Sequence, residues 1–380
     1  MSRNLFRPSF GTYPHLMVGR DQLIDEFEDT FDGILDPAGL TILVSGQRGM
    51  GKTVLLDSIR RAADTAGWLV ITESSSNGLL ARLTRDHLPR LLQLHSDTSP
   101  TRLGSANGTI GPLAGGASWT ERYPAESTLR SQITELTDAL QPSGRGLVIT
   151  VDEVQSADIE DLRKLGEIIQ YGRREERLLG FAAAGLSTPI EELLDHPGAT
   201  FLRRAEHHPI GRVGRTDVRA ALAGTVADSG YEIDVHALDV AADAVDGYPF
   251  MIQLVGYHSL KAHKTPGPVT IADVTAGIAA ARRRLGRHVH TPALRPLSNV
   301  DRTYLLAMAQ DDGPSRTGKI AERMDVTPQY AGEYRRRLIR DGIIEAAGHG
   351  LVRFTIPYTA EHLRQHAAHD ALDGLADENG

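Results

Sequence analysis

The chain has 380 residues, a formal net charge of −8 and no cysteine. That length suffices for two or three domains, and 41% hydrophobic with 24% charged residues is ordinary for a globular protein with buried cores. The missing cysteines exclude disulfides, thiolate metal sites and cysteine nucleophiles, and they favour a reducing, cytoplasmic location. The negative charge argues against a chain coated in nucleic acid, but it leaves room for a local basic face.

Neither a signal peptide nor a membrane span is expected. The first fourteen residues, MSRNLFRPSFGTYP, hold two prolines and no apolar core of signal-peptide length. The longest apolar run, LLGFAAAGL at 178–186, is far shorter than the roughly 18 residues of a membrane helix. We therefore predict a soluble, cytoplasmic protein with no membrane partner.

Residues 19–210 alternate between strand-like and helix-like segments, which predicts a parallel sheet with helices on both faces. The Gly-, Ser- and Thr-rich stretch 96–119 is expected to be a long loop, and we assign it no chemistry. The expected strands are 40–45, 68–72, 147–151, 179–185 and 205–210. The expected helices are 52–67, a stretch near 79–95, 125–140 and 157–177.

Strand signals end near residue 212, and four helices are expected around 216–228, 235–246, 249–263 and 271–286. Residues 290–298, HTPALRPLS, contain two prolines and are predicted to be a linker. Residues 299–360 are predicted to form three helices followed by two strands around a glycine-bearing turn. That is the order of a winged helix-turn-helix.

Residues 46–53, GQRGMGKT, fit the pattern G-x-x-x-x-G-K-[ST] without a mismatch, between a predicted strand and a predicted helix. Glycines let successive backbone N–H groups turn inward around a β-phosphate, and the helix that follows adds its positive N-terminal dipole. The Lys52 ammonium can reach the β- and γ-oxygens, and the Thr53 hydroxyl can ligate Mg²⁺. The predicted contacts of this loop with ATP are Gly46, Gly49, Met50, Gly51, Lys52 and Thr53.

A second acidic motif ends the strand at 147–151, where GLVITVDEVQ places Asp152 and Glu153. Ligands bind at the carboxyl ends of parallel strands, so this is a suitable place for metal-side groups. We expect Asp152 to hold Mg²⁺ through water, and Glu153 to orient and deprotonate the attacking water. Alone, the pair could equally begin the next helix; combined with the loop it predicts nucleotide hydrolysis.

Five segments together carry a family resemblance. They are MVGRDQLIDEF (17–27), the GQRGMGKT loop, LVITVDEVQ (147–155), FLRRAEHHPIGRV (201–213) and DGYPFMIQLVG (246–256). Their order resembles that of AAA+ ATPases, within the branch of origin-recognition-complex and archaeal-type ATPases that is related to STAND proteins. The resemblance covers nearly the whole chain, and it implies an ATPase that uses ATP and Mg²⁺ and assembles with itself or with an AAA+ partner.

The resemblance also implies roles for single residues. Val18, Gly19 and Arg20 would lie against the adenine or ribose, and Arg204 matches an arginine finger that acts on a neighbouring subunit's nucleotide. Ser187 or Thr188 falls near the place of a polar γ-phosphate sensor. The lid carries no sensor arginine; its Gly247-Tyr248-Pro249 resembles the G-x-P element of STAND proteins, with Pro249 near the nucleotide. Pro249 is equally well explained as a first-turn helix proline.

The third helix of the C-terminal unit is predicted to present a DNA-binding face. The residues expected to point outward and contact duplex DNA are Gln329, Tyr330, Arg336, Arg337 and Arg340. From Arg316 to Arg340 there are seven basic and three acidic residues, a positive patch on a negative protein. Winged helices also dock proteins, which leaves both uses open.

The sequence thus predicts an α/β P-loop core over 1–211, an α-helical lid over 212–290, a winged helix over 291–368 and an acidic tail over 369–380. We expect an ATPase, whose turnover could be slow, that couples ATP binding and hydrolysis to DNA or DNA-bound partners. Two alternatives are a STAND-like switch whose winged helix docks protein, and a transcription regulator with a vestigial pocket. Intact Lys52, Thr53, Asp152 and Glu153 count against the last. The lid and linker are expected to separate the C-terminal unit from the phosphate site.

Overall fold

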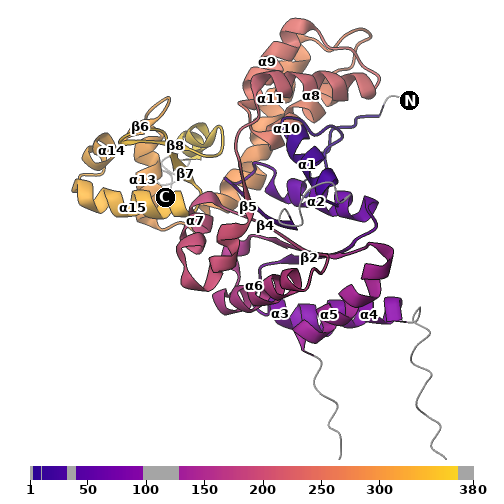
Figure 1. Cartoon of the computed structure of the whole chain (residues 1–380). Helices are drawn as coiled ribbons and strands as arrows, with labels where there is room; N and C mark the ends of the chain where they lie inside the picture. The colour runs from indigo at the N-terminus through magenta and orange to yellow at the C-terminus, as the bar shows by residue number, and fades with distance from the viewer. Residues whose placement is uncertain (1–2, 10, 32–39, 97–127, 367–380) are drawn as a thin grey trace, which may run out of the picture.

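The computed structural model describes residues 3–9, 11–31, 40–96 and 128–366. The predicted loop at 96–119 and the tail at 369–380 therefore lie outside the described residues, except for Ser96 at the end of a helix. In the described part, three units follow one another along the chain: an α/β core, a helical bundle above it, and a smaller unit beside it (Figure 1).

The core is a five-stranded parallel sheet with the strand order β2-β3-β4-β1-β5. Its strands are β1 (Thr41–Gly46), β2 (Leu69–Ser74), β3 (Leu147–Asp152), β4 (Leu179–Gly185) and β5 (Glu206–Ile210). All five strands agree with the predicted ones, because short apolar runs such as LTILVS and LGFAAAG suit strands that are buried on both faces.

Alternate residues of each strand supply the two faces of the sheet. Ile42 and Val44 of β1 pack on one side, and Leu43 packs on the other. The first side is covered by α1 (Asp21–Phe31) and α2 (Lys52–Thr65). The second is covered by α3 (Leu79–Arg82), α4 (Leu88–Ser96), α5 (Leu129–Leu140), α6 (Ile159–Arg174), α7 (Ser187–Asp195) and a 3₁₀-helical segment at Pro197–Arg204. The predicted helix–sheet–helix sandwich is present.

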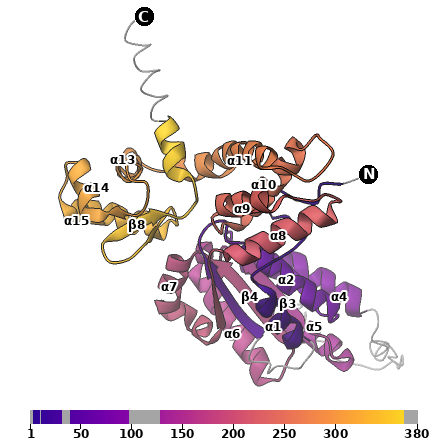
Figure 2. The ribbon, with the colours of Figure 1, turned by 90° about the horizontal axis from the view of Figure 1, so that it is seen from above.

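The lid is a bundle of four helices that lies above the core and over α2 (Figure 2). Its members are α8 (Arg215–Asp228), α9 (Val235–Val245), α10 (Pro249–Ala262) and α11 (Ile271–Leu285). Helices α10 and α11 approach closely because Gly277 has no side chain. A Cβ there would lie 2.6 Å from the Ser259 backbone nitrogen.

The predicted linker at 290–298 is wrong for most of its length. Helix α11 passes into a π-helical turn at Gly286–His290 and then into α12 (Thr291–Leu294). Pro292 lies in the first turn of α12, where a residue without an N–H is tolerated. Pro292 therefore does not break the helical backbone, which continues to Leu294; the residues 295–298, with Pro296, form the short irregular connection to α13 (Asn299–Met308).

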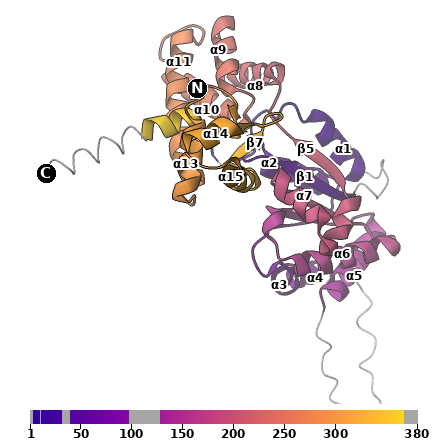
Figure 3. The ribbon, with the colours of Figure 1, turned by 90° about the vertical axis from the view of Figure 1, so that its left-hand side faces the viewer.

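The C-terminal unit contains the three helices and two strands expected from the sequence. Its helices are α13 (Asn299–Met308), α14 (Thr317–Arg323) and α15 (Pro328–Arg340). Its strands are β7 (Ile344–Ala346), β8 (Leu351–Phe354) and a two-residue β6 (Ser315–Arg316) that the sequence pattern does not predict, in an antiparallel sheet ordered β6-β8-β7. The unit lies beside α7 of the core and below the lid (Figure 3).

None of the helices in the described ranges is both long and apolar enough to cross a membrane.

The close α10–α11 crossing generates a stability prediction. Gly277→Ala should destabilise the protein by about 1–3 kcal/mol, because the added methyl group meets the Ser259 backbone as well as its hydroxyl, and the backbone cannot move aside cheaply. Gly332→Ala is the matched control: apart from the backbone of its own helix, no heavy atom lies within 4 Å of the place its methyl group would take, and alanine favours the helix by up to about 1 kcal/mol. Thermal unfolding measures both, and an equal melting temperature for the two variants would contradict this account of the helix spacing.

Candidate functional site

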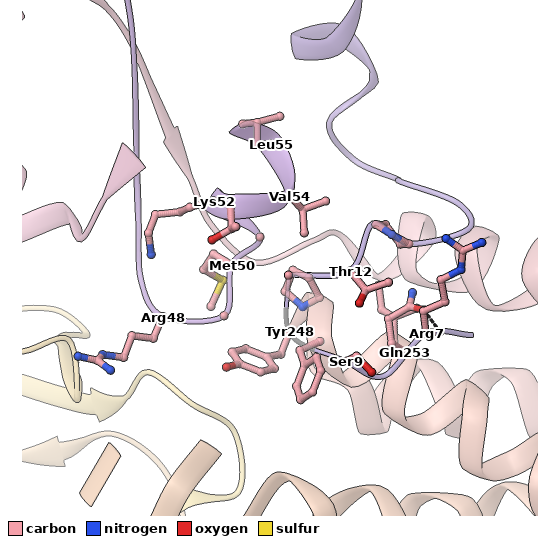
Figure 4. Close-up of a pocket in the computed structure, with 18 of the residues that line it drawn as sticks. Arg7, Ser9, Thr12, Arg48, Met50, Lys52, Val54, Leu55, Tyr248 and Gln253 are labelled. Atoms are coloured by element: carbon pink, nitrogen blue, oxygen red, sulfur yellow. Dashed lines mark hydrogen bonds between the residues drawn. The ribbon is translucent and has the colours of Figure 1, made fainter. Parts of the chain in front are cut away.

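The loop between β1 and α2 needs glycine at two positions for different reasons. Gly51 has φ +90°, a backbone conformation that other residues adopt only with strain. Gly49 has φ +77°, and in addition a Cβ there would lie 1.9 Å from the Tyr248 hydroxyl. Tyr248 lies beneath the loop near Met50 (Figure 4). The start of α10 therefore presses against the turn of the phosphate-loop motif.

Lys52 is held at the inner side of this loop. Its side chain is buried, and its Nζ donates a hydrogen bond to the Gln47 carbonyl at 3.1 Å. Burial lowers the pKa of Lys52, against the opposing attraction of Glu153 and Asp152. The folded protein therefore binds this proton less tightly than the unfolded chain, and the charged Lys52 costs folding free energy at neutral pH. An anion beside Lys52 would offset that cost.

The two acidic residues meet the loop as the motifs predict. The Thr53 hydroxyl donates to Asp152 Oδ2 at 2.6 Å, across 99 residues of sequence. Asp152 Oδ1 accepts from the Glu153 backbone N–H at 2.9 Å, so the carboxylate is oriented by both neighbours. Hydroxyl and carboxylate oxygens are the hard donors that Mg²⁺ prefers, and this pair could hold it.

A cavity of about 430 Å³ opens at the loop. Its wall joins the core, the lid and the segment before α1. Of the predicted ATP contacts, the following line it: Val18, Arg20, Gly49, Met50, Gly51, Lys52, Thr53 and Pro249. Glu153 lines it too, whereas Gly19 and Gly46 do not. Gly46 instead lets β1 pass β5, since a Cβ there would lie 2.7 Å from the Ile210 carbonyl oxygen.

Described residues between Arg7 and α1 form a wall of the cavity that the sequence pattern does not predict. The buried Phe6 packs where Gly256 of α10 leaves room, and the Arg7 backbone N–H donates to Gln253 Oε1 at 2.9 Å. Arg7, Gln253, Ser9 and Thr12 gather on one side of the cavity in Figure 4. No periodicity marks this segment. Only its prolines set it apart as extended chain.

The 3₁₀-helical segment before β5 holds two adjacent arginines in different states. Arg203 donates to the backbone carbonyls of Leu194, at 2.5 Å, and Asp195, at 2.9 Å. Arg204 is exposed, has no hydrogen-bond or ion-pair partner among the described residues, and does not line the cavity of its own chain. Ser187 and Thr188 begin α7 at half-buried positions, and Leu186 alone separates them from β4.

The C-terminal unit touches the phosphate loop, so the expected separation of the two sites is wrong. A Cβ on Gly342, directly after α15, would lie 3.3 Å from Gln47 Oε1 and 3.4 Å from a methyl carbon of Leu186. Arg212, at the start of the lid, also donates to the Thr355 carbonyl at 3.4 Å. In Figure 4, Arg48 points away from Tyr248 toward the ribbon of the C-terminal unit.

Arg337, one of the residues predicted to contact DNA, is paired within the C-terminal unit. Its Nε donates to Asp301 of α13 at 3.0 Å, and its guanidinium lies 4.6 Å from the centre of the Tyr334 ring. Arg323 similarly pairs with Asp311 at 2.6 Å. Asp301 and Asp311 lie before residue 316, so neither is included in the charge of the segment from Arg316 to Arg340. Because they pair with two of its arginines, the patch is less positive than the charge of that segment alone indicates. The remaining predicted residues are exposed: Gln329, Tyr330, Arg336 and Arg340.

Comparison with known proteins identifies the core. Residues 16–181 match the family model of the AAA ATPase domain. The α/β core is therefore similar to an AAA ATPase domain over these residues. Residues 287–363, from the π-helical turn through most of the C-terminal unit, match a domain of unknown function (DUF8462). No curated protein sequence matches the chain.

Solved structures extend the likeness of fold over all three units. A Walker-type ATPase of Pyrococcus abyssi is 15% identical, with a TM-score of 0.65, and the match covers 95% of this chain and 99% of that one. The ORC2 protein of Aeropyrum pernix, solved as ADPNP and ADP complexes, is also 15% identical, with a TM-score of 0.63 and 99% of both chains covered. The chain therefore has a fold similar to that of these two archaeal proteins.

The geometry of the loop generates a paired prediction. Lys52→Ala should abolish ATP binding, because the loop loses its direct phosphate charge. Glu153→Gln should bind ATP normally but lose about 10²–10⁴-fold in turnover, because the water loses its base. Melting temperature with and without ATP reports binding, since ligand at 100 times Kd stabilises by about 2.7 kcal/mol.

Lys164→Ala is the control for charge loss, since this exposed lysine lies on α6 and pairs only with Glu160 in the described structure. It should retain both the ATP-dependent melting shift and turnover. Turnover equal to wild type in Glu153→Gln would remove Glu153 from the mechanism.

Proposed function

We propose that this protein hydrolyses ATP with Mg²⁺ and couples its nucleotide state to duplex DNA or to proteins bound there. The observation that carries the proposal is the convergence of Lys52, the Thr53–Asp152 pair and Glu153 at one cavity of an AAA ATPase domain. A vestigial pocket would have no reason to keep the Thr53–Asp152 hydrogen bond beside a cavity that Lys52 and Glu153 line.

Each group has a role that follows from its position. The loop's N–H groups and Lys52 bind and orient the β- and γ-phosphates, at the N-terminus of α2. Thr53 and Asp152 hold Mg²⁺, which neutralises phosphate charge. Glu153 lines the cavity and accepts a proton from the attacking water. Val18, Arg20 and Pro249 form the wall toward the base.

Arg204 is proposed to act on the nucleotide of a neighbouring copy or of another AAA+ subunit. An arginine that is exposed, unpaired within the described residues and outside the lining of its own cavity is available to a partner. The anchored Arg203 beside it fixes the backbone from which Arg204 projects. Arginine fingers of this kind stabilise the charge that develops during phosphoryl transfer.

The C-terminal unit is proposed to be a winged helix that binds duplex DNA with α15. Gln329 and Tyr330 at its N-terminal end and Arg336 on its outer face are exposed, as a major-groove helix requires. Arg340 is exposed, and its Nε lies 3.8 Å from Asp341 Oδ1. In the β7–β8 pair, which would be the wing, Arg353 Nε lies 2.6 Å from Glu345 Oε1. These pairs would have to exchange partners to contact phosphate.

A second candidate is a STAND-like switch whose C-terminal unit docks a protein. The contact of the Gly342 turn with Gln47 favours it, because a unit seated on the phosphate loop can be released or held according to the nucleotide. The tie between Arg337 and Asp301 also favours it, since it withdraws one base-reading candidate from DNA.

Complementation tests the arginine finger. Arg204→Ala and Lys52→Ala should each be inactive alone, and mixing them should restore part of the turnover. A Lys52→Ala copy can supply Arg204 to the intact phosphate site of an Arg204→Ala copy, a contribution on the order of 10³ in kcat. The measurement is phosphate release over a series of mixing ratios, with assembly checked by size. If assembled mixtures recover nothing, Arg204 does not act across an interface.

DNA binding is tested by removing Arg336 and Arg340, the two arginines of α15 that are exposed. Arg336→Ala/Arg340→Ala should weaken binding to mixed-sequence duplex and lower the log–log salt slope by about 1.8, at about 0.9 for each lost phosphate contact. The control is Arg174→Ala, an exposed arginine of α6 on the core. Fluorescence anisotropy is measured with ATP and with ADP. Absence of binding in both states, or wild-type binding by the double variant, would favour the protein-docking switch.

A further inference from the structure

Gln155 occupies an unusual place between the predicted general base and the end of β4. Its Nε2 donates to Glu153 Oε2 at 2.5 Å, and its Oε1 accepts from the Leu186 backbone N–H at 3.3 Å. The second contact fixes how the amide is oriented. A backbone N–H can only donate, so the oxygen faces Leu186 and the NH₂ group faces the carboxylate.

The backbone turns sharply at Glu153, so that the Gln155 side chain can contact the Glu153 side chain. Glu153 has φ +54° and ψ +40°, a left-handed conformation that is costly for a residue with a side chain. Two contacts hold it there: the Ser75 hydroxyl donates to the Glu153 carbonyl, and the Glu153 N–H donates to Asp152. A single 3₁₀ turn, Val154–Ser156, follows at once. Strain of this kind, stabilised by its neighbours, is typical of functional sites.

Strand β4 ends in a glycine that makes room for the amide. A Cβ on Gly185 would lie 2.2 Å from Gln155 Oε1, so any other residue there would displace the glutamine. Leu186, whose N–H receives the amide oxygen, is also the residue that precedes α7. Gln155 is thus half-buried between two elements, while the Glu153 side chain that it contacts is exposed toward the cavity.

We infer that Gln155 is a positioning residue for hydrolysis, which holds the Glu153 carboxylate in one orientation and ties it to the β4–α7 junction. This inference rests on the proposed function, because it assumes that Glu153 acts on the attacking water. An exposed glutamate samples several rotamers; the amide restricts it to the one that faces the cavity. Misplacing a catalytic group by about 1 Å can cost on the order of 10² in rate.

Two substitutions distinguish positioning of the Glu153 carboxylate from mere support of the Leu186 backbone at the β4–α7 junction. Gln155→Met keeps the length of the side chain but makes neither hydrogen bond. Gln155→Glu retains an oxygen that accepts from Leu186, but it presents a second carboxylate to Glu153 in place of a donor. Gln22→Met is the matched control, since Gln22 donates to Glu26 at 3.0 Å on the exposed face of α1.

Steady-state hydrolysis and ATP affinity are measured on the full chain for wild type and all three variants. Both Gln155 variants should lose about 10–100-fold in kcat, with the Kd for ATP within about threefold of wild type. The control should change neither value. Wild-type kcat in Gln155→Glu would overturn the inference, because bracing of Leu186 alone would then account for Gln155.

The proposed function fails in a different way. If wild type shows no more turnover than Lys52→Ala, hydrolysis itself is excluded and Gln155 cannot serve it. Crystal structures of wild type and Gln155→Glu with a non-hydrolysable ATP analogue test the geometry independently of rate. The inference predicts that the Glu153 carboxylate moves in the variant, and an unchanged carboxylate would overturn it.

Discussion

The hydrogen bond from Thr53 to Asp152 is the contact on which the site depends. It can form because β1 and β3 run parallel with β4 between them, so that the three strands end at one edge of the sheet. That edge receives the phosphate loop from β1, the acidic pair from β3 and the Leu186 junction from β4. Placing β4 in the middle also gives Gln155, just past β3, a neighbour to bind.

The lid also constrains the phosphate loop, through Tyr248. Tyr248 is buried, and its hydroxyl fills the space beside Gly49; burial raises its pKa above the ordinary value, so it stays neutral. Arg212 pairs with Asp246 two residues before Tyr248, and the Val213 N–H donates to the Gly247 carbonyl at 2.8 Å. The segment that enters the lid is therefore fastened to the turn between α9 and α10, next to the Tyr248 side chain that contacts the loop.

Local pattern was sufficient for the elements whose cause is local. Buried runs such as LGFAAAG predict strands, and the loop motif predicts its own surroundings, because both depend on residues within a few positions. The N-terminal wall, the Arg337–Asp301 pair and the Gly342–Gln47 contact depend on segments that lie 36 to about 300 residues apart. The periodicity of a sequence does not predict which distant surface an extended segment or an arginine side chain will contact. The two prolines of 290–298 led to the wrong prediction of a linker for a related reason. A π-helical turn ends just before α12, so Pro292 falls in the first turn of a new helix, where its missing N–H is tolerated.

Leu186 contacts both a residue proposed to act in hydrolysis and the C-terminal unit proposed to respond to the nucleotide. Its backbone N–H binds Gln155, and its side chain meets the Gly342 turn of the C-terminal unit, which also meets Gln47 of the loop. Spatial neighbours are not by themselves an energetic connection; coupling requires an element with two arrangements that both sites favour differently. Such an element exists only if the C-terminal unit can leave its seat on Gln47 and Leu186. Whatever lifts it, duplex DNA or a protein, would act on the residues that surround the general base.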